Sequence, residues 1–130
     1  MSRKKNFLLL VCFSVVSIVA LTLIASEAMA QQQACVFIKV GAGFSGKMRV
    51  VSGSWTSPWS SDMPIGQQRC QPLANLAPGA PYSVEFKADL GKSKICSPEN
   101  LPYNPKDPGT ANFFAWGTTL NVKCSQMASE

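Results

Sequence analysis

The chain of 130 residues contains no histidine. The imidazole of histidine is the most common general base of enzymes, so its absence excludes Ser–His and Cys–His catalytic schemes. Zinc sites usually draw their ligands from histidine or from closely spaced cysteine pairs, and no two cysteines of this chain are near each other in sequence. We therefore expect neither a metal ion nor another cofactor.

Acidic residues are also scarce, at seven in the whole chain. Glycoside hydrolases need two carboxyl groups about 5 to 9.5 Å apart. Glu85 and Asp89 share one face of a predicted strand, but four residues at about 3.3 Å each place them about 13 Å apart. No second arrangement of acids suggests hydrolysis, and we predict that the protein is not an enzyme.

The N-terminal thirty residues have the pattern of an export signal. A basic start at residues 3–5 is followed by an apolar stretch, FLLLVCFSVVSIVALTLIA, at residues 7–25, and by Ala28-Met29-Ala30. Small residues in this spacing are typical of a signal-peptidase site, so we predict that residues 1–30 are a cleaved signal peptide. An uncut membrane anchor is the alternative. In either case the basic start stays inside, and residues 31–130 lie outside the cytoplasm.

Residues 31–130 are long enough for a single small domain. Removal of three basic residues and one acidic residue with the signal peptide lowers the formal net charge from +5 to +3. The lysines are scattered rather than clustered, so we do not expect binding to nucleic acid.

The glycine-rich stretch GAGFSGKM, residues 41–48, has the Gly-x-x-x-x-Gly-Lys spacing of a nucleotide-binding P-loop. A P-loop needs a helix after its lysine and a Ser or Thr that holds magnesium. Here Met48 follows Lys47, and the sequence continues with the pattern of a strand. We therefore predict no nucleotide site and interpret the glycines as a flexible connection between two antiparallel strands.

Four cysteines remain outside the signal peptide: Cys35, Cys70, Cys96 and Cys124. An even number in a short exported domain indicates two disulfides and an oxidising compartment, so we expect a periplasmic or secreted protein. Four cysteines allow three pairings. We predict Cys35 with Cys124, which would join the opening and closing strands, and Cys70 with Cys96, which would clamp a middle loop.

Apolar and polar residues alternate in several segments, which is the period of half-buried strands. The clearest is PYSVEFKADL at residues 81–90; others are KMRVV at 47–51, TTLNVKC at 118–124 and an aromatic candidate at 113–117. Proline and glycine at 77–80 and 107–110 suit type II turns. The sequence predicts an all-β fold, a small antiparallel β-sandwich stapled by two disulfides, with a partly open β-barrel as the alternative.

Two loops carry aromatic residues. Trp55 and Trp59 lie in the Ser- and Pro-rich residues 52–64, and Tyr103 lies in the proline-rich residues 97–109. Aromatic faces stack on sugar rings, bind cationic head groups and anchor in the pockets of partners. We predict a ligand site of Trp55, Trp59 and Tyr103 with the charge of Arg49 beside them, although the tryptophans could instead fold back to cap the core. Trp116, within a strand, is expected in the core.

These features predict an exported, non-enzymatic binding module that acts through loop aromatics. Its partner would be a glycan, a lipid head group or a protein. One alternative is a membrane-active β-protein that binds lipid or forms pores at a membrane surface. Another is a protein inhibitor or a structural component of the envelope, with residues 97–109 inserted into a partner.

Overall fold

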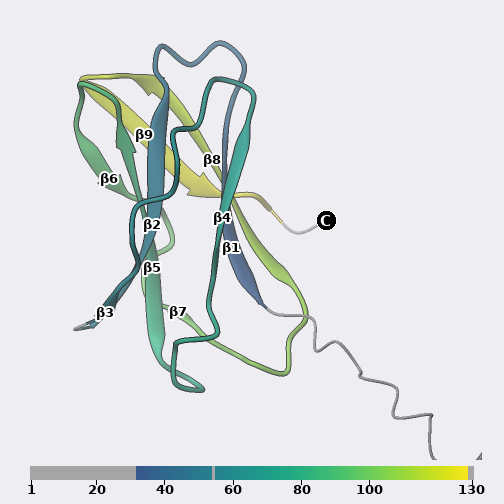
Figure 1. Cartoon of the computed structure of the whole chain (residues 1–130). Helices are drawn as coiled ribbons and strands as arrows, with labels where there is room; N and C mark the ends of the chain where they lie inside the picture. The colour runs from purple at the N-terminus through teal and green to yellow at the C-terminus, as the bar shows by residue number, and fades with distance from the viewer. Residues whose placement is uncertain (1–31, 54, 129–130) are drawn as a thin grey trace, which may run out of the picture.

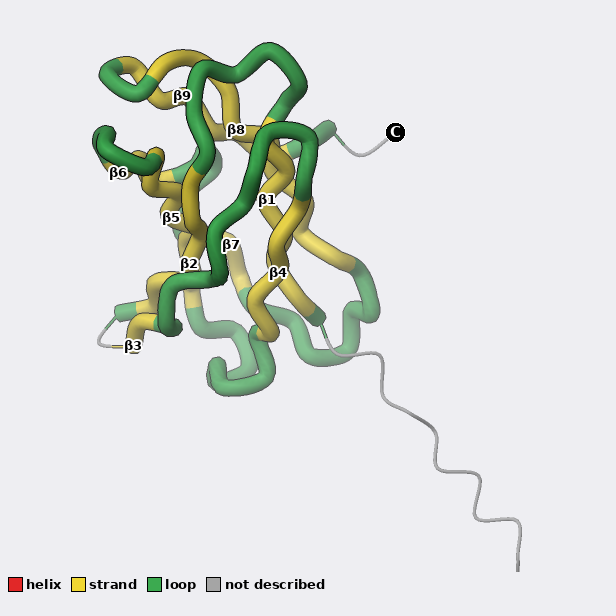
Figure 2. Tube along the Cα trace, turned by 45° about the horizontal axis from the view of Figure 1, so that its top comes forward, coloured by secondary structure: helices red, strands yellow, loops and turns green. Residues whose placement is uncertain are grey.

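The computed structural model describes residues 32–53 and 55–128 (Figure 1). The predicted signal peptide, residues 1–30, lies outside the described residues. Within them the chain forms nine strands and no helix, arranged as two sheets that pack against each other (Figure 2). The prediction of an all-β sandwich is confirmed, and the sheets do not close into a barrel.

The four-stranded sheet has the strand order β4-β1-β8-β9. Its strands are β1 (Gln33–Ile38), β4 (Gln68–Pro72), β8 (Thr110–Thr118) and β9 (Asn121–Gln126). Strand β1 runs parallel to β8, whereas the other strand pairs in the described residues are antiparallel. The parallel pair is possible because the chain passes through the other sheet between β1 and β8.

The five-stranded sheet has the order β3-β2-β5-β6, and β7 pairs with β5 outside this path. Its strands are β2 (Gly46–Ser52), β3 (Trp55–Thr56), β5 (Pro81–Ala88), β6 (Ser93–Ile95) and β7 (Leu101–Pro102). Strand β7 interrupts the proline-rich residues 97–109, which were predicted to be one long loop. Its two residues pair with Pro81 and Tyr82.

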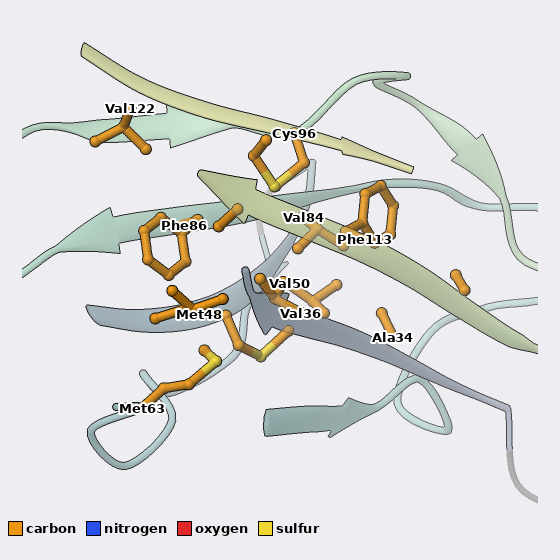
Figure 3. Packing of buried hydrophobic residues seen from close by; sticks show 14 of the residues in the cluster. Ala34, Val36, Met48, Val50, Met63, Val84, Phe86, Cys96, Phe113 and Val122 are labelled. Atoms are coloured by element: carbon orange, nitrogen blue, oxygen red, sulfur yellow. A yellow bond between two sulfur atoms is a disulfide. The ribbon is translucent and has the colours of Figure 1, made fainter. Parts of the chain in front are cut away.

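The core lies between the sheets and follows the alternation in the sequence. Tyr82, Val84, Phe86 and Ala88 of β5 are all buried, as predicted. Figure 3 shows buried side chains from both sheets meeting in this space. Those of β1, β2 and β8 include Val36, Ile38, Met48, Val50, Phe113 and Ala115. Side chains on the other face of each strand point outward, so each sheet also has an outer face.

The glycine-rich residues 41–46 connect the two sheets. The glycines were predicted to connect two antiparallel strands; strand β1 belongs to one sheet and β2 to the other, so the strands that they connect are not paired with each other. No helix follows Lys47, which lies in β2 opposite Lys87. Gly46 must be glycine because a Cβ there would lie 2.5 Å from the ring of Phe86 and would collide with the carbonyl of Lys87.

The two disulfides join Cys35 to Cys70 and Cys96 to Cys124, so the predicted pairing of Cys35 with Cys124 and Cys70 with Cys96 was wrong. The reason is the strand order. Strands β1 and β9 flank β8 on opposite sides, which keeps Cys35 away from Cys124. Cys35 instead lies directly opposite Cys70 in the register of β1 and β4.

One predicted turn is confirmed and another differs. Gly79 has φ of +78°, and Ala80 N–H donates to the Ala77 carbonyl at 3.0 Å, as in a type II turn. At residues 107–110, Gly109 N–H instead donates to the carboxylate of Asp107 at 2.8 Å. Leu120, expected on a strand face with Val122, lies in the β8–β9 turn and is exposed.

Candidate functional site

The structure does not bring the predicted loop aromatics together on the surface. Trp55 forms half of the short strand β3 and packs against the core, half-buried. Tyr103 is only 7% exposed, because its backbone pairs with residues 79–80 and carries its ring inward. These two side chains offer little area to a ligand.

Trp59 and Arg49 do contact each other, on the outer side of the five-stranded sheet. Ser57 and Ser60 hydrogen-bond along the edge of β2, which places Trp59 beside this strand. The Arg49 guanidinium lies 4.2 Å from the centroid of the Trp59 ring, and its Nε donates to Glu85 at 2.6 Å. The positive charge of Arg49 is therefore already paired, and one face of Trp59 is covered.

Trp116 lies on the outer face of β8, so the prediction that it belongs to the core was wrong. Phe113 and Ala115 point into the core, and alternation turns Phe114 and Trp116 to the opposite side, where both are half-buried. In the parallel pairing of β1 with β8, Phe37 lies opposite Phe114 and also faces outward.

These three rings and Lys39 form what we call the outer aromatic face of the four-stranded sheet. Phe37 and Phe114 meet edge to face, with centroids 5.9 Å apart. The Lys39 ammonium lies 4.5 Å from the centroid of Phe114 and 5.1 Å from that of Trp116. The face thus combines aromatic area with a cation that no carboxylate in the described residues pairs within salt-bridge distance.

A cavity of about 410 Å³ opens on the outer aromatic face. It is lined by Phe37, Gln68, Asn112, Phe113, Phe114 and Met127. Side-chain amides at its edge can donate and accept hydrogen bonds, whereas the rings supply apolar walls. Mostly apolar walls with a few polar groups are typical of small-ligand sites.

The charged side chains in the strands of the four-stranded sheet are all positive. The strands β1, β4, β8 and β9 contain Arg69 and Lys123 but no acidic residue, and Lys39 follows β1 directly. The described acids, Asp62, Glu85, Asp89, Glu99 and Asp107, all lie outside these strands. An anionic ligand would therefore meet attraction and no carboxylate repulsion from the sheet itself.

Sequence reasoning missed the outer aromatic face, although a signal for it was present. Asn112, Phe114 and Trp116 alternate along the sequence with the core residues Phe113 and Ala115, so they lie on the opposite face of the same strand. Only the pairing of β8 with β1 adds Phe37 to the same face. Aromatic residues on both faces of one strand were the available sign.

A second hollow, of about 190 Å³, lies where β5 and β7 approach β8. Tyr82 lines it, and burial raises the pKa of the Tyr82 hydroxyl, with a smaller contribution from the charge of Asp107. Desolvation disfavours the phenolate, so Tyr82 is a neutral core residue rather than a general base.

Among residues 32–53 and 55–128, no cluster of three Cys, Asp or Glu side chains could hold a metal ion. The same residues contain no helix of the length and apolar character needed to cross a membrane.

Neither a protein-family model nor a curated protein matches the chain. Among solved structures, the NMR structure of a protein from Eubacterium rectale is similar, with a TM-score of 0.54 and 9% sequence identity. The likeness covers 82% of this chain and 97% of that chain. At this identity it shows a shared fold and carries no function.

Proposed function

We propose that this protein is a non-enzymatic binding protein of the periplasm or the cell exterior, and that it binds an acidic glycan on the outer aromatic face. One observation carries the proposal. Phe37, Phe114, Trp116 and Lys39 share one open sheet face, beside a cavity, on a sheet whose strands contain no acid.

The chemistry of this face suits a sugar with a carboxylate. The flat apolar side of a sugar ring stacks on an aromatic ring, and its hydroxyls pair with amides such as those of Gln68 and Asn112. Lys39 and Lys123 would attract the carboxylate, since both are exposed on or beside this sheet.

We therefore place the ligand site on the strands of the four-stranded sheet and not on the loops. The first expectation relied on Trp55, Trp59, Tyr103 and Arg49, but two of these rings turn toward the core and Arg49 is paired with Glu85. Export to an oxidising compartment remains part of the proposal, because intramolecular disulfides are typical of extracellular and periplasmic proteins.

Binding of oligogalacturonate, an acidic glycan, tests the proposal by calorimetry, with a neutral glucan oligosaccharide for comparison. We expect binding of the acidic glycan and a loss of at least about tenfold in affinity for Trp116→Ala. Lys39→Gln should reduce the preference for the acidic over the neutral glycan. Trp59→Ala, in the β3–β4 connection beside the other sheet, is the matched control and should bind like the parent. Equal affinity of the parent and Trp116→Ala would contradict the proposal.

A further inference from the structure

Four large aliphatic side chains are exposed at one end of the sandwich. They are Val40, Ile65, Leu90 and Leu120, with exposed fractions of 82%, 46%, 104% and 77%. We call them the apolar loop tips, because each lies in a different connection between strands: β1–β2, β3–β4, β5–β6 and β8–β9. Figure 1 shows these four connections at the same end, at the top of the view.

Backbone hydrogen bonds tie these connections to one another. Asp89 N–H donates to the Ser45 carbonyl at 2.8 Å, and Lys92 N–H donates to the Thr119 carbonyl at 3.2 Å. Gly66 lies beside the Val40 side chain. An open hollow of about 950 Å³ lies between the loops, lined in part by Phe44, Pro64, Ile65 and Leu90. The connections that carry the tips are therefore tied together, and two of the tips, Ile65 and Leu90, line the hollow between them.

The backbone of Leu90 has a conformation that is unfavourable for leucine. Its φ is +56°, in the left-handed region that glycine and asparagine adopt most readily. A fully exposed side chain gains no burial that offsets this strain. Packing within the described residues therefore gives no reason for leucine at this position, whose backbone strain is uncompensated there.

The charge around the tips is mainly positive. Lys39 and Lys92 adjoin the tips and are exposed. Lys47 and Asp62, just below, pair with each other at 3.3 Å. Asp89 accepts a hydrogen bond from the Ser45 hydroxyl at 2.8 Å, which directs its carboxylate into the loop. An anionic surface would complement this end of the molecule.

We propose that the apolar loop tips insert into the interfacial region of an anionic lipid bilayer. Aliphatic side chains flanked by lysines bind such a surface through apolar burial together with attraction to anionic lipids. A second copy of the chain fits less well. Four separate side chains offer on the order of a few hundred Å² of apolar area, whereas each partner of a stable protein complex buries roughly 800 Å².

The bilayer site differs from the glycan site of the proposed function. The outer aromatic face lies on the side of one sheet, whereas the tips close one end of both sheets. Lys39 borders both, so the test leaves it unchanged. A protein with both sites would hold a glycan while resting end-on upon a membrane.

Co-sedimentation with vesicles tests the inference. The protein, expressed from its full chain and purified in the form that the cell makes, is mixed with vesicles of phosphatidylglycerol and phosphatidylcholine, or of phosphatidylcholine alone. The test variant carries Leu90→Ser and Leu120→Ser. The control is Met127→Ser, since Met127 is exposed but does not belong to the four tips. All forms share one N-terminus, so any vesicle binding by residues 7–25 is common to them.

We expect the double variant to bind anionic vesicles at least about fivefold less than the parent, and Met127→Ser and Trp116→Ala to bind like the parent. Leu90→Asn, which suits the backbone, should fold and still bind less. Equal co-sedimentation of the parent and the double variant would overturn the inference, and so would equal binding to both kinds of vesicle. A parent that dimerises without lipid and becomes monomeric in the double variant would assign the tips to a second copy instead.

Discussion

Cys96 and Cys124 join the two sheets of the sandwich covalently. Cys96 directly follows β6 in the five-stranded sheet, Cys124 lies on β9 in the four-stranded sheet, and both are buried in the core. The other disulfide has a different place. Cys35 and Cys70 are opposite each other within one sheet, and Cys70 is exposed on the edge strand β4. The two bridges therefore differ in how easily a reagent reaches them.

Mild reduction of the folded protein should open the disulfide of Cys35 and Cys70 first. A thiolate must reach a sulfur atom, and Cys70 is exposed whereas Cys96 and Cys124 are not. Alkylation followed by peptide mass mapping measures the order. A label should appear on Cys70 without denaturant, and on Cys96 and Cys124 only once denaturant is added. Label on Cys96 before Cys70 would contradict the prediction.

Gly46→Ala should destabilise the fold by about 1 to 3 kcal/mol, because the added methyl group overpacks a tight contact. Its Cβ would meet the Phe86 ring and the Lys87 carbonyl, and Lys87 is held by the β2–β5 ladder. Gly43→Ala is the matched control in the same connection, since the nearest atom to its Cβ lies at 3.6 Å. Urea denaturation measures both. Similar midpoints for the two variants would contradict the expected difference.

Leu90→Gly should stabilise the fold by up to about 1.5 kcal/mol. Relief of the left-handed conformation is worth about 1 to 2 kcal/mol, and the added freedom of the unfolded glycine subtracts about 0.5 to 1. Leu120→Gly has only the second effect, the added freedom of the unfolded glycine, because Leu120 is also largely exposed but has no positive φ. Thermal unfolding should show opposite signs for the two variants. A shift of the same sign in both would refute the role of the backbone at Leu90.

Alkaline pH should weaken the fold through Tyr82. Its pKa is raised above 10.0 by burial and, to a smaller extent, by Asp107. The folded state then holds the proton more tightly than the unfolded state, so the contribution of Tyr82 is fully present below pH 10.0 and is lost as the pH rises toward the raised pKa.

Denaturant unfolding on both sides of this pH measures the effect. Tyr82→Phe should lose less stability than the parent over the same rise in pH, because phenylalanine carries no proton to release. Asp107→Asn should lower the pKa of Tyr82 slightly. A parent and a Tyr82→Phe variant with identical slopes would exclude Tyr82 as the source.

The fold class and most of the core followed from local patterns. Alternation in 81–88 sorts inward from outward side chains within one strand, because successive residues on a strand point to opposite sides wherever it lies. The even cysteine count predicted two disulfides in the same way. Rejection of the P-loop also needed only the residues after Lys47, which continue as a strand.

The disulfide pairing and the candidate sites could not be obtained from such patterns. The disulfide pairing depends on which strands are neighbours. Strand β8, which is far from β1 in sequence, lies between β1 and β9 in the sheet. The exposure of Trp116 depends on which face of β8 meets the other sheet, and Tyr103 is buried by the turn at 79–80.

The four apolar loop tips are the clearest case of this division. Their residues are ordinary in the sequence, where Leu120 belongs to the alternating residues 118–124. They come together because two sheets stack and bring four connections to one end. The alternation of apolar and polar side chains involves only a few successive residues, so it can be recognised in the sequence. Proximity across dozens of residues is set by the packing of the sheets, and it exists only in the folded chain.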